Sequence, residues 1–117
     1  MWIVIKMSLR IRGVEFEEGP IKIRSWNPPY RAGVYAFITP GDSDKTWVFL
    51  YIGETGNLSE RGFPASHHKY ECCKKEAGSD EDLYVIIHLM PGSTSKDRRE
   101  METKLIHAGR GKPVCND

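Results

Sequence analysis

Two tyrosines, an arginine and a glutamate have side chains that can act together on a phosphate group. Tyr35 and Tyr51 each lie within an apolar segment, and Arg61 follows ten residues after the second tyrosine. A guanidinium can form paired hydrogen bonds with two phosphate oxygens. Glu102 lies within a charged segment farther along the chain. A lone carboxylate suits Mg²⁺, which keeps much of its hydration and is often held by only one or two acids.

The tyrosines are the candidates for activating a water molecule. A phenol has a pKa of about 10, so it is a poor base at neutral pH unless a nearby cation lowers that pKa. Arg61 or a metal ion can supply such a cation. We expect Tyr35 and Tyr51 to come from neighbouring strands, with both rings on one face of a sheet. The alternative interpretation is a pair of core tyrosines whose hydroxyl groups reach the rim of the core.

The segment 47–61 must position these groups. It begins with an apolar run of the length of one buried strand, which Gly53 ends. A Gly-Asn turn follows, and Asn57 can cap the helix that comes next. A strand that passes through a turn directly into a helix is therefore predicted. This arrangement presents Tyr51 and Arg61 near one end of a rigid sheet.

The order of these residues resembles the GIY-YIG nuclease superfamily. Gly33-Val34-Tyr35 resembles the first motif of the family, and Tyr51-Ile52-Gly53 resembles the second. The resemblance covers residues 32–117. It extends to the asparagine-leucine pair, the arginine, the acid and the late asparagine of the family, which correspond here to Asn57-Leu58, Arg61, Glu102 and Asn116.

The resemblance implies a metal-dependent endonuclease that hydrolyses DNA phosphodiester bonds, as nucleases of DNA repair or restriction do. Tyr35 or Tyr51 would activate the attacking water. Arg61 and a Mg²⁺ or Mn²⁺ ion at Glu102 would neutralise charge on the phosphate. Asn116 would support the site by hydrogen bonding, and no small-molecule cofactor is implied.

Two positions depart from the family pattern. Some members have a lysine after the second motif, where this chain has Glu54, and a carboxylate repels a phosphate unless a cation intervenes. Members usually have a histidine or tyrosine about one turn after the arginine, where this chain has Ala65. We expect His68, or else His67, to replace it. The alternative function is a catalytically inactive module on the same scaffold that binds nucleic acid or a protein partner.

Length and charge limit the possibilities further. A chain of 117 residues predicts one domain, with residues 1–31 as an N-terminal extension and residues 32–117 as a nuclease-like core. The formal net charge of +1 does not indicate a large DNA-binding surface, although a local basic groove is compatible with it. A domain this small, with no second module, is short of specificity determinants, so a protein partner that supplies specificity is expected. No apolar run approaches about 20 residues, so no membrane span is predicted.

The cysteines favour a reducing compartment. There are three of them, an odd number, and Cys72 and Cys73 are adjacent. This pattern does not indicate a disulfide framework, so free thiols and a cytoplasmic protein without a signal peptide are expected. His68 and Cys72 are four residues apart and could form half of a zinc site, completed by Cys115 or His88. Ordinary histidines and partly buried thiols are the alternative.

The hydrophobic pattern predicts an α+β fold (an α/β sandwich) with a small central antiparallel β-sheet flanked by helices. The core strands are expected at residues 33–39, 47–52 and 83–89, and a helix at 94–108. Residues 3–26 alternate as a β-hairpin that turns at Gly19-Pro20 and extends or covers one edge of the sheet. The basic residues of this hairpin form either a solvated face or an accessory phosphate-contacting surface, and they are Lys6, Arg10, Arg12, Lys22 and Arg24.

Overall fold

The central strand of the fold is buried along almost its whole length. A computed structural model of the chain describes residues 9–43, 46–61, 67–109 and 111–116. Within these residues, the main sheet is antiparallel and the predicted α+β class is confirmed. The strand order is β3-β6-β4-β5, with β3 at Glu18–Lys22, β6 at Tyr84–Leu89, β4 at Gly33–Pro40 and β5 at Trp47–Thr55. The three predicted core strands are β4, β5 and β6.

Strand β4 occupies the middle because both of its faces are apolar. It pairs with β5 on one side and β6 on the other, so that its Phe37 lies between Tyr51 and Val85. Side chains alternate between the faces of a strand, so Tyr35 and Phe37 point to one side of the sheet, and Ala36 points to the other. Each face has its own apolar core, one around Tyr35 and Phe37 and the other around Ala36.

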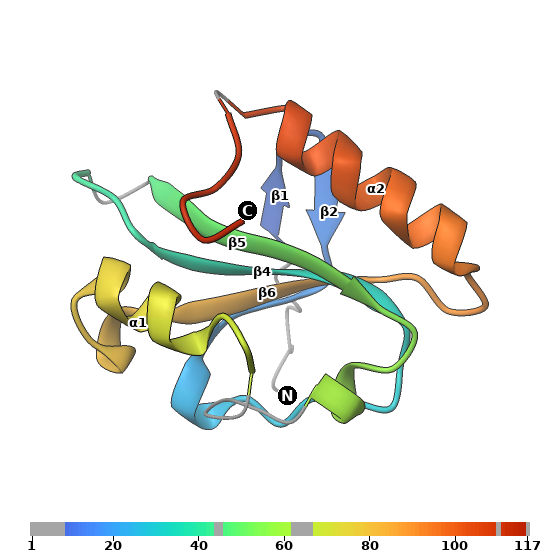
Figure 1. Cartoon of the computed structure of the whole chain (residues 1–117), viewed down its shortest axis with the longest axis horizontal. Coiled ribbons are helices and arrows are strands. Elements are labelled where there is room, and N and C mark those ends of the chain that lie inside the picture. The colour runs from blue at the N-terminus through green and yellow to red at the C-terminus, as the bar shows by residue number, and fades with distance from the viewer. Residues whose placement is uncertain (1–8, 44–45, 62–66, 110, 117) are drawn as a thin grey trace, which may run out of the picture.

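A different helix covers each of these faces (Figure 1). Helix α1, Tyr70–Ala77, packs with the core that contains Tyr35. Helix α2, Ser95–His107, packs with the core that contains Ala36, through the fully buried Leu105. Short 3₁₀ helices complete this part of the chain: η1 at Ile23–Ser25, η2 at Leu58–Arg61 and η3 at Asp80–Asp82.

Helix α2 begins where the sequence predicts. The Thr94 side chain accepts a hydrogen bond from the Asp97 amide at 3.1 Å, and the Asp97 carboxylate accepts one from the Thr94 amide at 3.0 Å. This reciprocal capping box satisfies backbone donors that have no partner inside the helix. The hydrogen bond from the Thr94 backbone also lowers the pKa of Asp97.

The N-terminal extension differs from the prediction. Strands β1, Leu9–Ile11, and β2, Val14–Phe16, form a separate hairpin that packs on the α2 side of the sheet. Its turn is Arg12-Gly13, where both residues have positive φ angles of 55° and 78°, as a two-residue hairpin turn requires. The predicted turn at Gly19-Pro20 is wrong. These residues lie inside β3, where the pairing with β6 is irregular and Gly19 has a φ of 100°.

The basic residues of the extension that the structure describes contribute to folding contacts. Arg12 donates a hydrogen bond to the Leu105 carbonyl at 2.8 Å, and its guanidinium lies over the Phe49 ring at 4.3 Å. Burial lowers the pKa of Arg12. Arg24 forms an ion pair with Asp80 at 3.1 Å, which links η1 to η3. The extension therefore uses these cations to join elements, and Lys6 lies outside the described residues.

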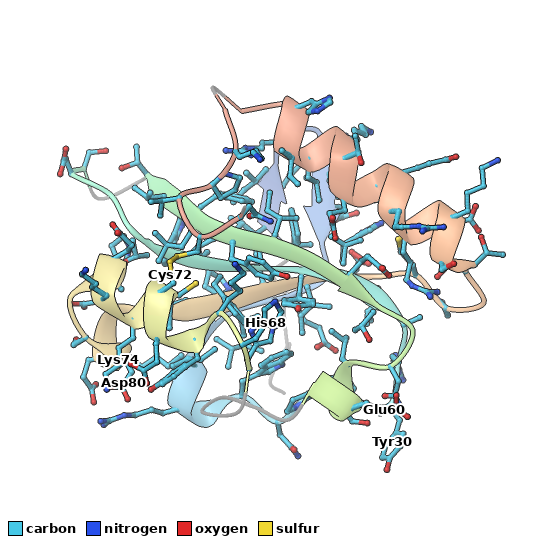
Figure 2. All side chains as sticks on the ribbon, viewed as in Figure 1. Tyr30, Glu60, His68, Cys72, Lys74 and Asp80 are labelled. Atoms are coloured by element: carbon cyan, nitrogen blue, oxygen red, sulfur yellow. A yellow bond between two sulfur atoms is a disulfide. The ribbon has the colours of Figure 1, made fainter. Side chains whose placement is uncertain are left out.

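The expectation of free cysteines is wrong for two of the three. Cys72 on α1 forms a disulfide with Cys115, 43 residues later, with a Cα–Cα distance of 5.9 Å (Figure 2). Only the C-terminal path of the chain brings Cys115 to α1, which explains why residue spacing did not reveal this pair. The Cys72 sulfur is not available to zinc, and the argument for a cytoplasmic protein loses its basis. Cys73 keeps a buried thiol, and burial raises its pKa to about 12.

Nowhere in the described residues is there a helix with the length and apolar character needed to cross a membrane.

Candidate active site

Five rings gather on the α1 side of the sheet and are called here the aromatic cluster: Tyr35, Phe37, Tyr51, His67 and His68. The strand register assembles the first three. Phe37 pairs directly with Tyr51 across β4 and β5, and Tyr35 lies two residues away on the same face. The Tyr35 and Tyr51 ring centroids are 6.0 Å apart. The predicted placement of both tyrosines on one face is therefore observed.

Gly53 makes this close arrangement possible. It pairs with Tyr35 across the two strands, and its backbone lies beneath both tyrosine rings. A Cβ atom at Gly53 would lie 2.7 Å from ring atoms of both Tyr35 and Tyr51, a distance that real Cβ contacts do not show. The prediction that Gly53 ends the strand is wrong, because β5 continues to Thr55, and the glycine of the second motif has a steric role inside the strand.

His67 forms the most informative hydrogen bond of the cluster. Its Nε2 lies 2.7 Å from the Tyr35 hydroxyl oxygen, and its Nδ1 accepts a hydrogen bond from the Lys69 amide at 3.0 Å. Because Nδ1 accepts, the neutral ring carries its hydrogen on Nε2 and donates it to Tyr35. The tyrosine oxygen is thus an acceptor in this pair. Both side chains are buried, with 1% and 5% of their surface exposed.

His68 and Tyr51 form the part of the cluster that reaches solvent. His68 is exposed and stacks on His67, with ring centroids 4.7 Å apart and an angle of 19° between the planes. Its ring, labelled in Figure 2, also lies edge-on to the Tyr51 ring, with the centroids 6.0 Å apart. Tyr51 itself is half-buried. The cluster therefore has a buried layer of Tyr35 and His67, and an accessible layer of Tyr51 and His68.

Asn116 lies at the edge of the sheet next to the cluster. Its side chain accepts a hydrogen bond from the Ile52 amide at 2.8 Å and donates one to the Ile52 carbonyl at 2.9 Å. The neighbouring Cys115 amide donates to the Leu50 carbonyl at 2.9 Å. The C-terminal segment thus occupies the outer edge of β5 on both sides of Tyr51, and the disulfide holds it there.

The remaining predicted site residues come from other parts of the fold. Arg61 is the last residue of η2, and its side chain is outside what the structure describes. Glu102 is half-buried on α2, the helix that covers the face opposite Tyr35. The structure therefore brings the two tyrosines and two histidines together, whereas a meeting of these groups with Glu102 and Arg61 stays a prediction.

Glu54 has the neutralising cation that the sequence analysis required. Its carboxylate accepts a hydrogen bond from Arg98 Nε at 3.0 Å, in a pair whose side chains are only 19% and 10% exposed. The Arg98 Nη1 atom donates to Ser93. Arg98 therefore binds Glu54 and Ser93. The sequence analysis did not single out Arg98, although the charge of Glu54 was a signal that a cation must lie nearby.

The donor set for a metal ion is small. Over the described ranges, no group of three or more histidine, cysteine, aspartate or glutamate side chains is arranged to hold a metal ion. A Mg²⁺ ion that keeps most of its waters needs only one or two protein carboxylates. A single carboxylate such as that of Glu102 is compatible with this requirement. It is not enough for an ion that takes all its ligands from the protein, such as structural zinc.

Comparisons with known proteins gave a structural likeness. No protein-family model matches the chain, and no curated protein matches it. Among solved structures, two point mutants of the GIY-YIG N-terminal endonuclease domain of UvrC from Thermotoga maritima are similar to it. Both are tyrosine-to-phenylalanine mutants bound to the catalytic divalent cation.

The two matches are alike in extent. Each covers 77% of this chain and 87% of the other, with a TM-score of 0.46 and sequence identities of 23% and 24%. In structure, the chain is similar to a GIY-YIG endonuclease domain. A likeness at this TM-score says nothing about the chemistry of this chain, which has to be argued from its own residues.

Proposed function

We propose that this chain is a metal-dependent endonuclease that hydrolyses DNA phosphodiester bonds with a water molecule activated by tyrosine. The observation that carries the proposal is the Tyr35–His67 hydrogen bond beside Tyr51, which arranges a phenol and an imidazole on a rigid sheet. The resemblance of the motif residues to the GIY-YIG nucleases supports it. The likeness to solved structures is not part of the argument.

Tyr51 is the residue that activates the water in this proposal. It is half-buried, so solvent reaches it, and it lies beside the exposed ring of His68. In its phenolate form Tyr51 takes the proton of the attacking water, and His68 in its protonated form supplies a proton to the leaving oxygen. The buried pair of Tyr35 and His67 packs against Tyr51 and fixes the position of its ring, with centroids 6.0 Å and 5.5 Å away.

Charge on the phosphate requires cations. Arg61, on η2, would donate paired hydrogen bonds to the phosphate oxygens. Glu102 would hold a hydrated Mg²⁺ or Mn²⁺ ion, which supplies further neutralisation of phosphate charge when bound. Asn116 holds the edge of β5 in place beneath the reacting groups through its two hydrogen bonds with Ile52.

A plasmid-cleavage assay with Mg²⁺ tests the proposal. Tyr51→Phe should lower the rate by about 100-fold or more, because it removes the group that transfers the proton. Tyr35→Phe should lower it less. Glu102→Ala should abolish cleavage, whereas Glu100→Ala, a matched control on an exposed position of the same helix, should not. Cleavage that persists unchanged in Glu102→Ala would refute the role of that residue. A wild-type protein that does not cleave would refute the proposed endonuclease activity.

The second candidate is a non-catalytic module that binds nucleic acid or a protein partner. It is favoured by the burial of Tyr35 and His67 and by the placement of α2 across the sheet from them. Such a module would show salt-dependent DNA affinity without metal-dependent cleavage. A titration of DNA binding against salt, run beside the cleavage assay, separates the two candidates. If DNA does not bind at all, a protein partner remains.

The enzyme proposal includes a protein partner that supplies specificity. The formal net charge of +1 offers little long-range attraction for DNA. A partner that contributes a basic surface would raise the affinity without changing the site.

A further inference from the structure

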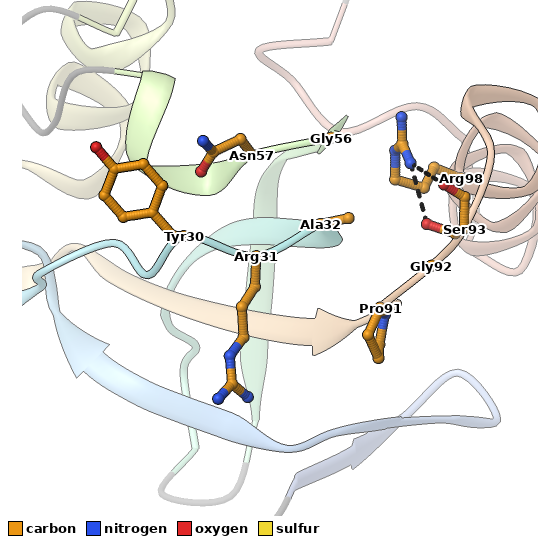
Figure 3. Close-up of a pocket in the computed structure, with 9 residues that line it drawn as sticks. All are labelled: Tyr30, Arg31, Ala32, Gly56, Asn57, Pro91, Gly92, Ser93 and Arg98. Atoms are coloured by element: carbon orange, nitrogen blue, oxygen red, sulfur yellow. Dashed lines mark hydrogen bonds between the residues drawn. The ribbon is translucent and has the colours of Figure 1, made fainter.

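A second concave site lies at the end of the sheet, apart from the aromatic cluster. Its volume is about 570 Å³, which is within the range of small-molecule pockets. Three loops form it, at residues 30–32, 56–57 and 91–93, and Arg98 of α2 completes one wall (Figure 3). None of the predicted catalytic residues lines it.

An exposed tyrosine stands at the rim of this pocket. Tyr30 has 85% of its surface exposed, although its ring is large and mostly apolar. The loop that carries it is fixed by backbone hydrogen bonds on both sides. The Arg31 carbonyl accepts from the Leu58 amide at 2.9 Å, and the Pro29 carbonyl accepts from the Ser59 amide at 3.1 Å. The fold thus holds a flat ring in water at a defined position.

The opposite wall is equally well fixed. Arg98 is 92% buried, since only 8% of its surface is exposed, and its hydrogen bonds to Glu54 and Ser93 hold its guanidinium in one orientation. Gly56 leaves room beside it, because a Cβ atom there would lie 3.2 Å from Arg98 Nη2. The charge of Arg98 is balanced by Glu54, so this wall is polar and nearly neutral.

Two further groups can bind a ligand in this pocket. The Asn57 side-chain oxygen accepts hydrogen bonds from Ser59, but its amide nitrogen has no hydrogen-bond partner among the described residues. In Figure 3 the amide of Asn57 extends toward the Tyr30 side of the pocket. Arg31 is exposed and forms no ion pair in the part of the chain that the structure describes. The residues that line the pocket therefore offer one aromatic face, one amide donor and one available cation, the last on a side chain that extends away from the other two groups in Figure 3.

This set of groups matches one nucleotide. A nucleobase stacks on an exposed aromatic ring whatever its sequence, and its edge can accept a hydrogen bond from an amide. A single phosphate can bind the single available guanidinium. A nucleoside diphosphate or triphosphate fits poorly, because Arg98 is already neutralised by Glu54.

We propose that this pocket binds an unpaired nucleotide of a single-stranded DNA segment. The proposal rests on the proposed function in that DNA is the ligand, but it does not require cleavage. Gly56 comes directly after the end of β5 and five residues after Tyr51, a distance of about 17 Å for an extended chain, or about five stacked nucleotides of one strand. The pocket would therefore hold the unpaired strand of a DNA with a single-stranded tail. The aromatic cluster would face the other end of that DNA.

Fluorescence anisotropy with a labelled 20-nucleotide oligothymidine, in EDTA, tests the proposal directly. Tyr30→Ala should weaken binding by about 5- to 100-fold, the range for losing one base–aromatic stack. Tyr30→Phe keeps the ring and should bind like the wild type. Val48→Ala, another exposed apolar position outside the pocket, is the matched control and should also bind like the wild type. Arg31→Ala should reduce the slope of log affinity against log salt concentration by about 1, the value for one phosphate contact.

A blunt duplex of the same length provides the contrast. Tyr30→Ala should leave its affinity unchanged, because its paired bases are not free to stack on a protein ring. Equal affinity of wild type and Tyr30→Ala for the single strand would overturn the proposal, as would an equal loss on the blunt duplex or a wild type that does not bind the single strand. Because EDTA prevents metal-dependent cleavage, these outcomes are separate from the plasmid assay: a protein that cleaves can fail here, and one that does not cleave can pass.

Discussion

The two faces of the main sheet are built from the same strands but serve different purposes. On one face, Tyr35, Phe37 and Tyr51 meet two histidines, and polar groups lie among the rings. On the other face, Ala36 and Ile52 pack with aliphatic residues of α2. Alternate residues of one strand thus line either the aromatic cluster or the aliphatic core, because successive side chains point to opposite faces.

The two faces are also held by different means. Helix α1 has 8 residues and is tied to the C-terminal segment by the Cys72–Cys115 disulfide. Helix α2 has 13 residues, a capping box and the buried Leu105. The face that carries the polar groups thus combines an apolar core with a covalent link, whereas the other face combines an apolar core with a capped helix. Changes on either face should therefore have separable effects.

Loss of the disulfide should have the largest effect on stability. Cys115→Ser should lower the free energy of unfolding by about 4 kcal/mol, from the entropy of opening a loop of this length. The loss should concentrate on the aromatic face, since Cys115 holds Asn116 at the edge of β5. Urea unfolding followed by circular dichroism measures the change. Val114→Ala, at an exposed position next to it, is the control, and equal unfolding with and without a reductant would contradict the prediction.

Truncation on the α2 face should come next. Leu105→Ala should lower the free energy of unfolding by about 3 kcal/mol, because it leaves a cavity in the aliphatic core. The Tyr35–His67 hydrogen bond should survive, which the imidazole signals of His67 in an NMR spectrum can report. Thr103→Ala, exposed on the same helix, should change neither quantity. A change in the His67 signals of Leu105→Ala as large as that in Cys115→Ser would show that the two faces are not separable.

Gly53→Ala should cause a moderate loss of stability with a marked effect on the aromatic cluster. The added Cβ displaces both tyrosine rings, at a cost of about 1–3 kcal/mol for overpacking. Tyrosine fluorescence and the His67 signals should change, whereas the α2 face should keep its amide-exchange protection. Val48→Ala, on the exposed side of the same strand, should leave the tyrosine signals as they are. Unchanged tyrosine signals in Gly53→Ala would contradict the steric role of the glycine.

The smallest effect is expected from an acid beneath the aromatic face. The hydrogen bond from Arg24 is the main cause that lowers the pKa of Asp80 below its ordinary value of 3.8, and a hydrogen bond from Tyr70 adds to it. A carboxyl group whose pKa is lowered in the folded state stabilises the fold at pH values above its ordinary pKa. This contribution is lost as the pH falls through the folded-state pKa.

Asp80→Asn should therefore lower the urea midpoint near neutral pH, and the difference from the wild type should vanish as the pH falls well below 3.8. Glu76→Gln removes an equal charge from an exposed position on α1 and should show a smaller difference. A difference in urea midpoint between Asp80→Asn and the wild type that grows toward acid pH would contradict this role of the Asp80 carboxylate.

Much of the fold was predictable from the sequence. The apolar runs at residues 33–39, 47–52 and 83–89 predicted the core strands, and the Thr94 region predicted where α2 begins. Each of these features depends on residues within a few positions of one another. The two tyrosines were expected on one face, and the register of β4 and β5 confirms it.

The candidate site was only partly predictable. The resemblance to the GIY-YIG nucleases selected Tyr35, Tyr51 and two histidines, but it could not reveal that His67 binds Tyr35 or that Arg98 neutralises Glu54. It also placed the hairpin turn at Gly19-Pro20 instead of at Arg12-Gly13, because both pairs have turn-forming residues. Competing local signals of similar strength can be decided only by which segment finds a partner strand.

The sequence by itself determined the core strands, the start of α2 and the residue types available for chemistry. Periodicity and capping act within a few residues, so they can be recognised along the chain. Only the tertiary structure decided that α2 covers the face opposite Tyr35, that Cys72 bonds Cys115, and that Asn116 binds Ile52 across a separation of 64 residues. These pairings depend on the path of the chain between the partners, which no short-range pattern records.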